Sequence, residues 1–231
     1  MMILGIIQAR IDSTRFPLKI FSEFSDGTSL LERVVRQVSH SKLIDNIVIA
    51  TNYFSYSMIR EIVDRLKLNV DVKVGDDEDV LGRFIKCISS YNSNFDNIVR
   101  ITADNPLTCP IAIDEAIKLH ISKNADLTHF LGIPLGTGVE VIKTSRLFEI
   151  NELSFEMYDR EHVTPYFYKH KEIYKVLEPV YREGWDYQSI RVTIDYPIDL
   201  ESVDRILHKL DYKLPVYIDD VVSVVEALTN V

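Results

Sequence analysis

Short apolar runs alternate along this chain with segments whose apolar residues recur every three or four positions, and no other feature constrains the fold as much. In the first half, four runs have the length of one buried strand each: Ile3–Gln8, Asn46–Ala50, Val70–Val74 and Asn97–Ile101. Four helical segments separate or follow them: Leu30–Val38, Met58–Leu66, Val80–Ile88 and Ile111–Ile121. Apolar strands that alternate with helices are typical of a mostly parallel sheet with helices on both faces. The pattern therefore predicts a doubly wound α/β fold, in which ligands bind beyond the carboxyl ends of the strands.

The second half of the chain is less regular. After a glycine-rich turn at Gly132–Gly138, we expect strands at Val139–Ile142, Lys175–Val180 and Ile190–Ile194, and helices at Glu161–His170, Leu200–Leu210 and Asp219–Leu228. No internal repeat, low-complexity tract or clear linker divides the sequence. We therefore expect residues 1–231 to form a single domain, with an insertion around residues 130–185 that protrudes from the sheet.

The composition indicates a globular protein whose main partner is neither nucleic acid nor a membrane. A hydrophobic content of 46% and a charged content of 26% are ordinary for such a protein. The formal net charge of −9 argues against a surface that coats nucleic acid or an anionic membrane. Cys87 and Cys109 lack metal-ligand spacing, and neither a signal peptide nor an apolar stretch of membrane-spanning length is evident. We therefore expect a cytoplasmic protein with reduced thiols.

A loop with three cations follows the first expected strand. This cationic loop, residues 9–19, contains Arg10, Arg15 and Lys19 together with Ala9 and Ser13. Cationic side chains and free backbone N–H groups can offset the charge of a polyanion such as a nucleoside triphosphate. Because the chain as a whole is acidic, this local cluster of cations indicates an anion-binding site more strongly than it would in a basic protein. The alternative interpretation is a solvated basic turn.

Two aspartates, Asp104 and Asp195, each follow an expected strand directly. Each has a proline two positions later, at Pro106 and Pro197. Magnesium prefers oxygen ligands and often takes one or two protein carboxylates together with phosphates. Because strand ends collect at one edge of the sheet, these carboxylates could converge on one magnesium ion. The alternative is an aspartate that only caps a turn.

A third acidic segment, Asp77-Glu78-Asp79, matches the Asp-x-Asp pattern of metal-dependent glycosyltransferases. It lies directly before the helix expected from Val80, where acidic side chains stabilise the helix N-terminus. We therefore favour helix capping over metal binding for this segment.

The cationic loop resembles the signature loop of the sugar-activating cytidylyltransferases, which join CMP to acidic sugars. The matching residues are Ala9-Arg10, Ser13-Thr14-Arg15, Pro17 and Lys19. Leu18 stands where the family often has a glycine, and Ala103 replaces the glycine before Asp104. The segment that begins at Asp195 is similar to the second magnesium motif of the family. In the same segment, we interpret Asp199 as the N-cap of the helix from Leu200.

Two further segments are similar to one branch of that family, which includes the spore-coat polysaccharide biosynthesis protein F. They are the string Arg-Glu-His-Val-Thr-Pro-Tyr at residues 160–166 and the strand Val-Glu-Val at residues 139–141. The resemblance extends from residue 3 to about residue 210.

The resemblance implies a Rossmann-like domain of the nucleotide-diphospho-sugar-transferase type. It also implies a magnesium-dependent transfer of CMP from CTP to a sugar, expected to be acidic, with release of pyrophosphate for surface polysaccharide synthesis. The implied nucleotide-binding residues are Ala9, Arg10, Ser13, Arg15, Lys19, Arg83 and Asp104, with catalysis assigned to Arg10, Arg15 and Lys19. The implied sugar-binding residues are Glu140, Arg160, His162 and Tyr166, and the implied magnesium ligands are Asp104 and Asp195. CTP and the sugar are the expected partners, and a homodimer is left open.

Two other functions remain as alternatives. One is a glycosyltransferase, or another sugar nucleotidyltransferase, of the same fold. The other is a noncatalytic nucleotide-binding homologue, against which the presence of Lys19, Asp104 and Asp195 argues, since binding alone does not need all three. No motif for a nucleophilic serine or cysteine is present.

Overall fold

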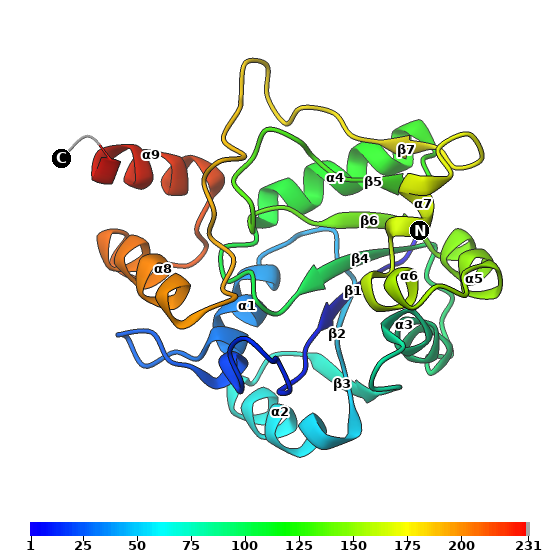
Figure 1. The fold of residues 1–231 in the computed structure, drawn as a ribbon, viewed down its shortest axis with the longest axis horizontal. Coiled ribbons are helices and arrows are strands. Elements are labelled where there is room, and N and C mark those ends of the chain that lie inside the picture. Colours follow the sequence, from blue (N-terminus) through cyan, green and yellow to red (C-terminus); the bar gives the residue numbers. More distant parts are fainter. Residues whose placement is uncertain (230–231) are drawn as a thin grey trace.

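The computed structural model, which describes residues 1–229, forms one α/β domain around a seven-stranded sheet (Figure 1). The strand order is β3-β2-β1-β4-β6-β5-β7. The strands are β1 (Ile3–Gln8), β2 (Asn46–Thr51), β3 (Val70–Val74), β4 (Asn97–Thr102), β5 (Leu127–Thr128), β6 (Glu140–Lys143) and β7 (Val176–Leu177). Strands β1 to β4 are parallel, whereas β6 runs antiparallel to both β4 and β5. The predicted α/β class with a mostly parallel sheet is confirmed.

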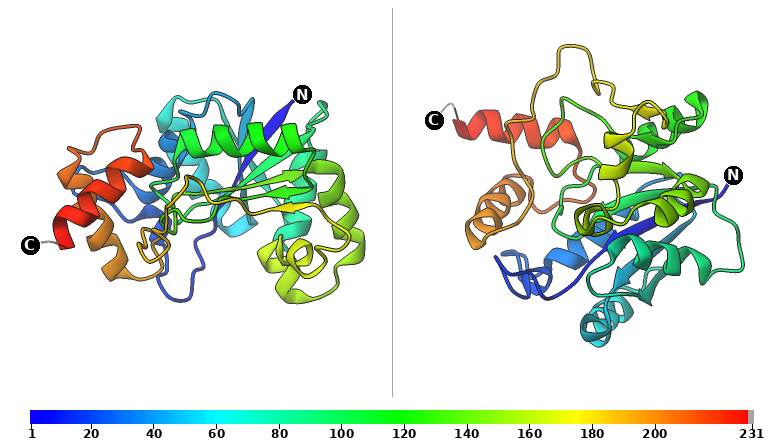
Figure 2. Two further views of the ribbon diagram at one scale, coloured as in Figure 1. Left: turned by 90° about the horizontal axis from the view of Figure 1, so that it is seen from above. Right: turned by 45° about the vertical axis from the view of Figure 1, so that its right-hand side comes forward.

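Helices cover both faces of the sheet, as Figure 2 shows for α4 on one side and α5 and α6 on the other. The helices are η1 (Lys19–Phe21), α1 (Leu30–Val38), α2 (Tyr53–Leu66), α3 (Val80–Ser89), α4 (Pro110–Lys123), α5 (Thr144–Leu153), α6 (Met157–His162), α7 (Pro165–Lys169), α8 (Pro197–Lys209) and α9 (Ile218–Thr229). Strand β1 explains the two layers, because successive side chains of a strand point to opposite faces. Ile3 and Ile7 pack with α1, α2 and α4, whereas Leu4 and Ile6 pack with α3, α5 and α7.

The order of the strands reverses at β1 and β4. Strands β2 and β3 extend from one side of β1, and the chain then crosses back to place β4 on its other side. Loops that leave the carboxyl ends of β1 and β4 therefore diverge, and such a switch point is where open α/β sheets bind ligands. We call this side of the sheet the carboxyl edge.

The prediction of a strand at Ile190–Ile194 is wrong, because this segment forms no part of the sheet. It runs in an extended path across the carboxyl edge, where Arg191 forms an isolated bridge with Leu135. The Val192 N–H donates to the Leu135 carbonyl at 2.8 Å, and the Ile194 N–H donates to the Asp104 carbonyl at 2.9 Å. The alternation of apolar residues thus reflects burial of Val192 and Ile194 beneath a loop rather than pairing in a ladder.

The region of residues 130–185, where we expected an insertion, contributes β6, β7 and the helices α5 to α7. The connection from β7 to α8 projects beyond the rest of the chain in Figure 1. The helix expected over residues 161–170 is divided into α6 and α7, and the sequence analysis did not identify α5 or the two-residue strand β5. No helix among residues 1–229 is long and apolar enough to span a membrane.

Helix α1 holds the connection between α8 and α9 through two buried polar side chains. The guanidinium of Arg33 donates to the carbonyls of Tyr212 and Lys213 at 2.9 and 2.7 Å. Gln37 donates to the Val216 carbonyl and accepts from the Val216 N–H at 3.1 Å. These bonds fix the part of the chain that follows the extended segment at the carboxyl edge.

Replacing Gln37 with alanine should lower the free energy of unfolding by about 2–4 kcal/mol, because it leaves a buried N–H and a buried carbonyl of Val216 without partners. The measurement is urea denaturation monitored by circular dichroism. Arg36→Ala is the matched control on the same helix. It removes a partly exposed ion pair with Glu32 and should change the free energy by no more than about 0.5 kcal/mol. Equal losses for the two variants would contradict the assigned role.

Candidate functional site

Lys19 joins two carboxylates that come from distant parts of the chain. Its Nζ donates to Asp104 Oδ2 at 3.0 Å and lies 3.6 Å from Asp195 Oδ1. The two carboxylate oxygens therefore cannot be farther apart than the sum of these distances. The Lys19 side chain is only 11% exposed, and its ammonium also donates to the Ile194 carbonyl at 2.8 Å. The structure thus brings together the two aspartates that we expected to converge.

Backbone contacts explain how Asp104 and Asp195 meet. Strand β4 ends at Thr102, and the next residues turn back so that the Asn105 N–H donates to the Thr102 carbonyl at 3.2 Å. The Ile194 N–H then binds the carbonyl of Asp104. This hydrogen bond places Asp195, the next residue, directly beside Asp104.

Leu18 adopts a left-handed backbone conformation, with φ of 60° and ψ of 14°. The family that this loop resembles often has a glycine at this position, and a glycine adopts such a conformation without strain. For a residue with a side chain it costs about 1–2 kcal/mol. The loop keeps its path because the Leu18 N–H donates to Ile11 at 3.0 Å and the Lys19 N–H to Phe16 at 3.2 Å. The substitution therefore leaves Lys19 at the start of η1 and pointing toward the carboxylates.

Arginines surround the remaining sides of Asp195. Arg15 Nη2 donates to Asp195 Oδ1 at 2.6 Å, while Arg191 binds the other oxygen. The Arg15 side chain is 54% exposed and lies over the ring of Tyr196, at 5.4 Å from its centroid. Together with Lys19, these two arginines place three cationic side chains around one partly buried carboxylate.

The cationic loop and both carboxylates line one cavity of about 250 Å³, which we call the loop cavity. Arg10 contributes to it and is only loosely paired, at 3.6 Å from Asp12 and 3.7 Å from Glu161. The predicted site residues in its wall are Ala9, Arg10, Ser13, Arg15, Lys19, Asp104 and Asp195.

Asp199 has a different position from the one we expected. Helix α8 begins at Pro197, so Asp199 lies in its first turn and is not the N-cap. Its carboxylate accepts the N–H groups of Asp195 and Tyr196, both at 2.8 Å. Burial opposes ionisation of this carboxyl, but the two N–H donors and Arg191 outweigh it and lower the pKa of Asp199. Asp199 therefore orients the peptide that carries Asp195.

Arg83 is not among the residues that line the loop cavity. Its side chain is buried and donates to the carbonyls of Asp76 and Asp77 at 2.8 and 2.7 Å. Burial, with a smaller contribution from Arg10, lowers the pKa of Arg83. The guanidinium thus shapes the acidic turn before α3.

The acidic segment before α3 caps that helix, as the sequence analysis favoured. Asp79 is the N-cap, and its Oδ1 accepts the Gly82 N–H at 2.8 Å. Asp76 accepts the N–H groups of Glu78 and Asp79, which lowers the pKa of Asp76. Within residues 1–229, no group of three or more histidine, cysteine or acidic side chains is arranged to hold a metal ion.

Of the four residues expected to bind the sugar, Arg160 and Tyr166 make other contacts. Arg160 donates to Asp79 Oδ2 at 2.5 Å and to Asn151 Oδ1 at 3.0 Å, so it ties α6 to the start of α3. Tyr166 packs on the ring of His170 at a centroid distance of 4.4 Å. These two side chains therefore hold the α5–α7 region together.

His162 and Glu140 face cavities at the carboxyl edge. His162 packs on Tyr158 and lines an open depression that Arg100 shares. Glu140 lines a second cavity of about 450 Å³, which we call the Glu140 cavity. Thr102 lies in the walls of both this cavity and the loop cavity, so the two adjoin.

Glu140 is the centre of a hydrogen-bond network. It accepts from Arg100 Nη1 at 2.7 Å, from Thr164 Oγ1 at 3.1 Å and from the Tyr168 hydroxyl at 2.9 Å. Burial first, and then the nearby Glu140 carboxylate, raise the pKa of Tyr168, so this hydroxyl keeps its proton. The sequence analysis did not identify Arg100, His129 and Tyr168 as site residues. Arg100 carried a signal, because it is the only charged residue in the apolar run of β4.

A strained turn delivers Thr164 to this network. Val163 has φ of 71° and ψ of −49°, and the Thr164 N–H donates to the His162 carbonyl at 2.8 Å. This i to i+2 hydrogen bond defines a γ-turn of the rare positive-φ type. A β-branched residue seldom adopts positive φ, and such outliers concentrate at functional sites.

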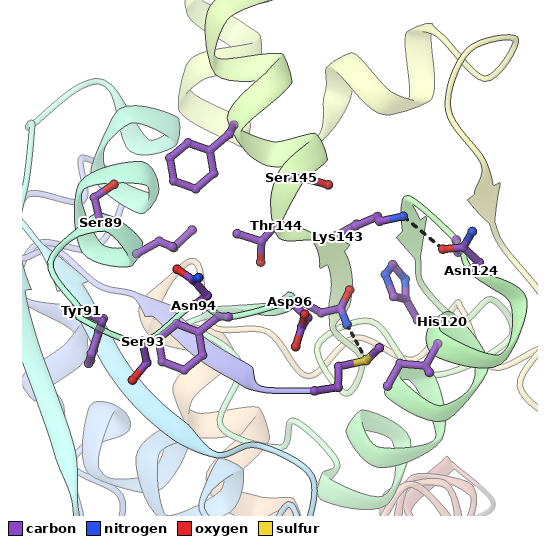
Figure 3. A pocket seen from close by; sticks show the side chains of 17 residues that line it. Ser89, Tyr91, Ser93, Asn94, Asp96, His120, Asn124, Lys143, Thr144 and Ser145 are labelled. Carbon is purple, nitrogen blue, oxygen red and sulfur yellow. Dashed lines mark hydrogen bonds between the residues drawn. The ribbon is translucent and has the colours of Figure 1, made fainter.

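A cavity larger than the loop cavity and the Glu140 cavity lies at the opposite edge of the sheet and has a different character. Figure 3 shows its lining, in which the Lys143 ammonium donates to Asn124 Oδ1 at 3.1 Å. Its volume is about 880 Å³. Burial lowers the pKa of His120, in its wall, to about 4, so that this imidazole is neutral. None of the cations of the loop reaches this cavity, and the features expected of a triphosphate site lie instead at the carboxyl edge.

Comparisons with known proteins agree with the resemblance seen in the sequence. Residues 4–219 match the family model described as cytidylyltransferase. The chain is 34% identical over 211 residues to spore coat polysaccharide biosynthesis protein SpsF of Bacillus subtilis, which covers 90% of this chain and 87% of SpsF. A solved cytidylyltransferase of Leptospira borgpetersenii is similar with a TM-score of 0.88 and 27% identity, over 100% of this chain and 96% of that one. CMP:2-keto-3-deoxy-manno-octonic acid synthetase complexed with CTP shares the fold, with a TM-score of 0.70 and 12% identity, over 91% of this chain and all of that one.

The family model covers nearly the whole sheet, the cationic loop and both aspartates at the carboxyl edge. The similarity to SpsF likewise extends over most of both chains. This protein is therefore a nucleotidyltransferase that belongs to the cytidylyltransferase family.

Proposed function

We propose that this protein transfers CMP from CTP to a sugar and releases pyrophosphate, with magnesium as its metal. The observation that carries the proposal is the contact of one ammonium, that of Lys19, with both Asp104 and Asp195 in the wall of the loop cavity. A triphosphate with its magnesium ion needs both cationic side chains and carboxylates, and a site for a simple anion does not need the carboxylates.

The side chains at the loop cavity fit a hard divalent cation. Asp104 and Asp195 offer carboxylate oxygens, which magnesium prefers, and both are partly exposed, at 26% and 17%. These two residues would hold the ion, and a bound magnesium ion would neutralise charge on the phosphates. Lys19 already provides one positive charge between them.

The cations of the loop suit the charge that forms during transfer. In the proposed reaction a sugar hydroxyl attacks the α-phosphorus of CTP, and the bond to the leaving pyrophosphate breaks. Arg10, Arg15 and Lys19 would bind the triphosphate and stabilise the negative charge that grows on pyrophosphate. Such a reaction depends on positioning and charge stabilisation and needs no covalent intermediate.

The choice of CTP rests on family membership and on the solved relative of the same fold that holds CTP. Because SpsF takes its name from a spore coat polysaccharide, we assign the product to surface polysaccharide synthesis in the cytoplasm. A single-domain chain that acts alone or as a homodimer is consistent with this role. Pyrophosphate release separates the proposal from its main alternative, since a glycosyltransferase that consumes a nucleotide sugar releases none.

CTP with magnesium should raise the melting temperature of the protein more than ATP or GTP does. At a concentration one hundred times its Kd, a ligand stabilises the folded state by about 2.7 kcal/mol. Differential scanning fluorimetry with each triphosphate measures the shift, and the matched control is each triphosphate with EDTA. Equal shifts for all the nucleotides would remove the assignment to CTP but leave triphosphate binding in place.

Lys19→Ala and Arg15→Ala should each reduce turnover by about a hundredfold or more, the usual effect of removing one group that stabilises transition-state charge. Pyrophosphate release from CTP, measured with a panel of acidic and neutral sugars, tests this. Arg60→Ala is the control, because Arg60 lies on α2 and pairs with Asp64 at 2.7 Å. Normal turnover in either loop variant, or failure of the variants to fold, would show that the loop has a structural role.

Asp104→Asn and Asp195→Asn should each raise the magnesium concentration needed for half-maximal turnover. If the two carboxylates hold one ion, the double variant should be little worse than either single variant. Magnesium titration of the turnover rate measures the effect, with Asp64→Asn as a control on the exposed face of α2. Multiplicative losses in the double variant would indicate two independent roles.

A further inference from the structure

His129 is the terminal residue of a chain of hydrogen bonds in the Glu140 cavity. Its Nδ1 lies 3.1 Å from the Tyr168 hydroxyl, which in turn lies 2.9 Å from Glu140 Oε1. The backbone of His129 is also fixed, because its N–H donates to the Leu177 carbonyl at 3.0 Å. Both the backbone and one ring nitrogen of this histidine are thus held in place.

The chemistry of these groups determines which nitrogen of His129 carries the proton. An ionised carboxylate only accepts hydrogen bonds, so the single proton of the Tyr168 hydroxyl goes to Glu140. The hydroxyl can then only accept from the imidazole, and Nδ1 must be the protonated nitrogen. In the neutral ring, Nε2 therefore keeps its lone pair, and within residues 1–229 no protein group is bonded to it.

The topology places this lone pair close to the proposed chemistry. Strand β6 is antiparallel to both β4 and β5, so the carboxyl ends of β4 and β5 lie at the same edge of the sheet. His129 directly follows β5 and lines the Glu140 cavity, which shares Thr102 with the loop cavity. A sugar in the Glu140 cavity would thus have the His129 side chain on one side and the loop cavity on the other.

We propose that His129 accepts the proton of the attacking sugar hydroxyl, and that Tyr168 and Glu140 position it for this step. The inference rests on the proposed CMP transfer. As the hydroxyl oxygen forms its bond to the α-phosphorus, its proton moves to Nε2, and the electrons of the breaking P–O bond leave with pyrophosphate. Glu140 is unsuited to this role, since three donors already occupy its oxygens.

Several charged groups face the His129–Tyr168 pair from the surrounding elements. Glu140 from β6 and Arg100 from β4 form an ion pair at 2.7 Å. Lys171 and Glu178, which flank β7, form a second pair, and the Lys171 ammonium lies 5.5 Å from the centre of the Tyr168 ring. Each pair is neutral overall, so these groups place no net charge beside His129.

The first test measures the state of the imidazole in the full-length protein, without a sugar. Nitrogen-15 NMR of the ring at neutral pH should show His129 protonated at Nδ1. Tyr168→Phe, which removes the hydroxyl partner but keeps the ring, should abolish that preference. A ring protonated at Nε2 in the unaltered protein would overturn the proposal.

The second test is the rate of pyrophosphate release from CTP with the fastest acceptor in the sugar panel. His129→Ala should reduce kcat by about a hundredfold or more, the scale of general base catalysis, and added imidazole should restore part of the rate. Activity of the unaltered protein should fall as the pH drops through the range where imidazoles titrate, and His129→Ala should lose this dependence. Tyr168→Phe should lose about tenfold and should not respond to imidazole.

His208→Gln is the matched control, because His208 also contacts a tyrosine ring, at 6.2 Å from that of Tyr212, but lies on the exposed side of α8. It should retain full activity. His129→Ala should keep the CTP-dependent rise in melting temperature, and absence of that rise in the unaltered protein would refute the proposed function itself. Normal turnover in His129→Ala, or a loss that neither pH nor imidazole alters, would refute only the role of His129.

Discussion

A single ammonium group holds two carboxylates together at the carboxyl edge of the sheet. Without a cation between them, the carboxylates of Asp104 and Asp195 would repel each other. The Lys19 ammonium offsets that repulsion, because it lies 3.0 Å from Asp104 Oδ2 and 3.6 Å from Asp195 Oδ1. Arg15 and Arg191 complete the neutralisation around Asp195. The two carboxylates can therefore lie close together at the edge of the loop cavity.

The sheet supports this arrangement by collecting its polar residues at one edge. The loop after β1, the turn after β4, the start of β6 and the end of β5 all meet there. The loop cavity and the Glu140 cavity adjoin through Thr102. The cationic loop and the hydrogen-bond network around Glu140 thus occupy neighbouring parts of one site.

The sequence predicted the parts of this site that depend on local pattern. The cationic loop follows an apolar strand, and Asp104 follows another, so both positions could be inferred from strand ends. We expected Asp195 at the end of a sheet strand; it does lie near Asp104, but Ile190–Ile194 pairs with a loop and not with the sheet. Arg83 and Arg160 show why side-chain roles are harder to infer, since their partners are carbonyl and carboxylate oxygens that only the folded chain brings near. Tyr168 and His129 were missed because their hydrogen bond joins α7 to the end of β5, across 39 residues.

The reversed direction of β6 has a consequence for how the protein can open. Because β6 starts at the carboxyl edge, Glu140 lies at the site, and the chain must pass to the far edge and return through α5 to α7 before it supplies Thr164 and Tyr168. Thr164 and Tyr168 thus belong to a separate crossover, which includes the strained turn at Val163. Local opening of this crossover would remove two donors from Glu140 and leave the contacts of Lys19 intact, since none of them involves α5 to α7. Opening would reach the loop cavity through Glu161, which belongs to α6, lines that cavity and lies 3.7 Å from Arg10, so the two parts of the site are coupled through this ion pair.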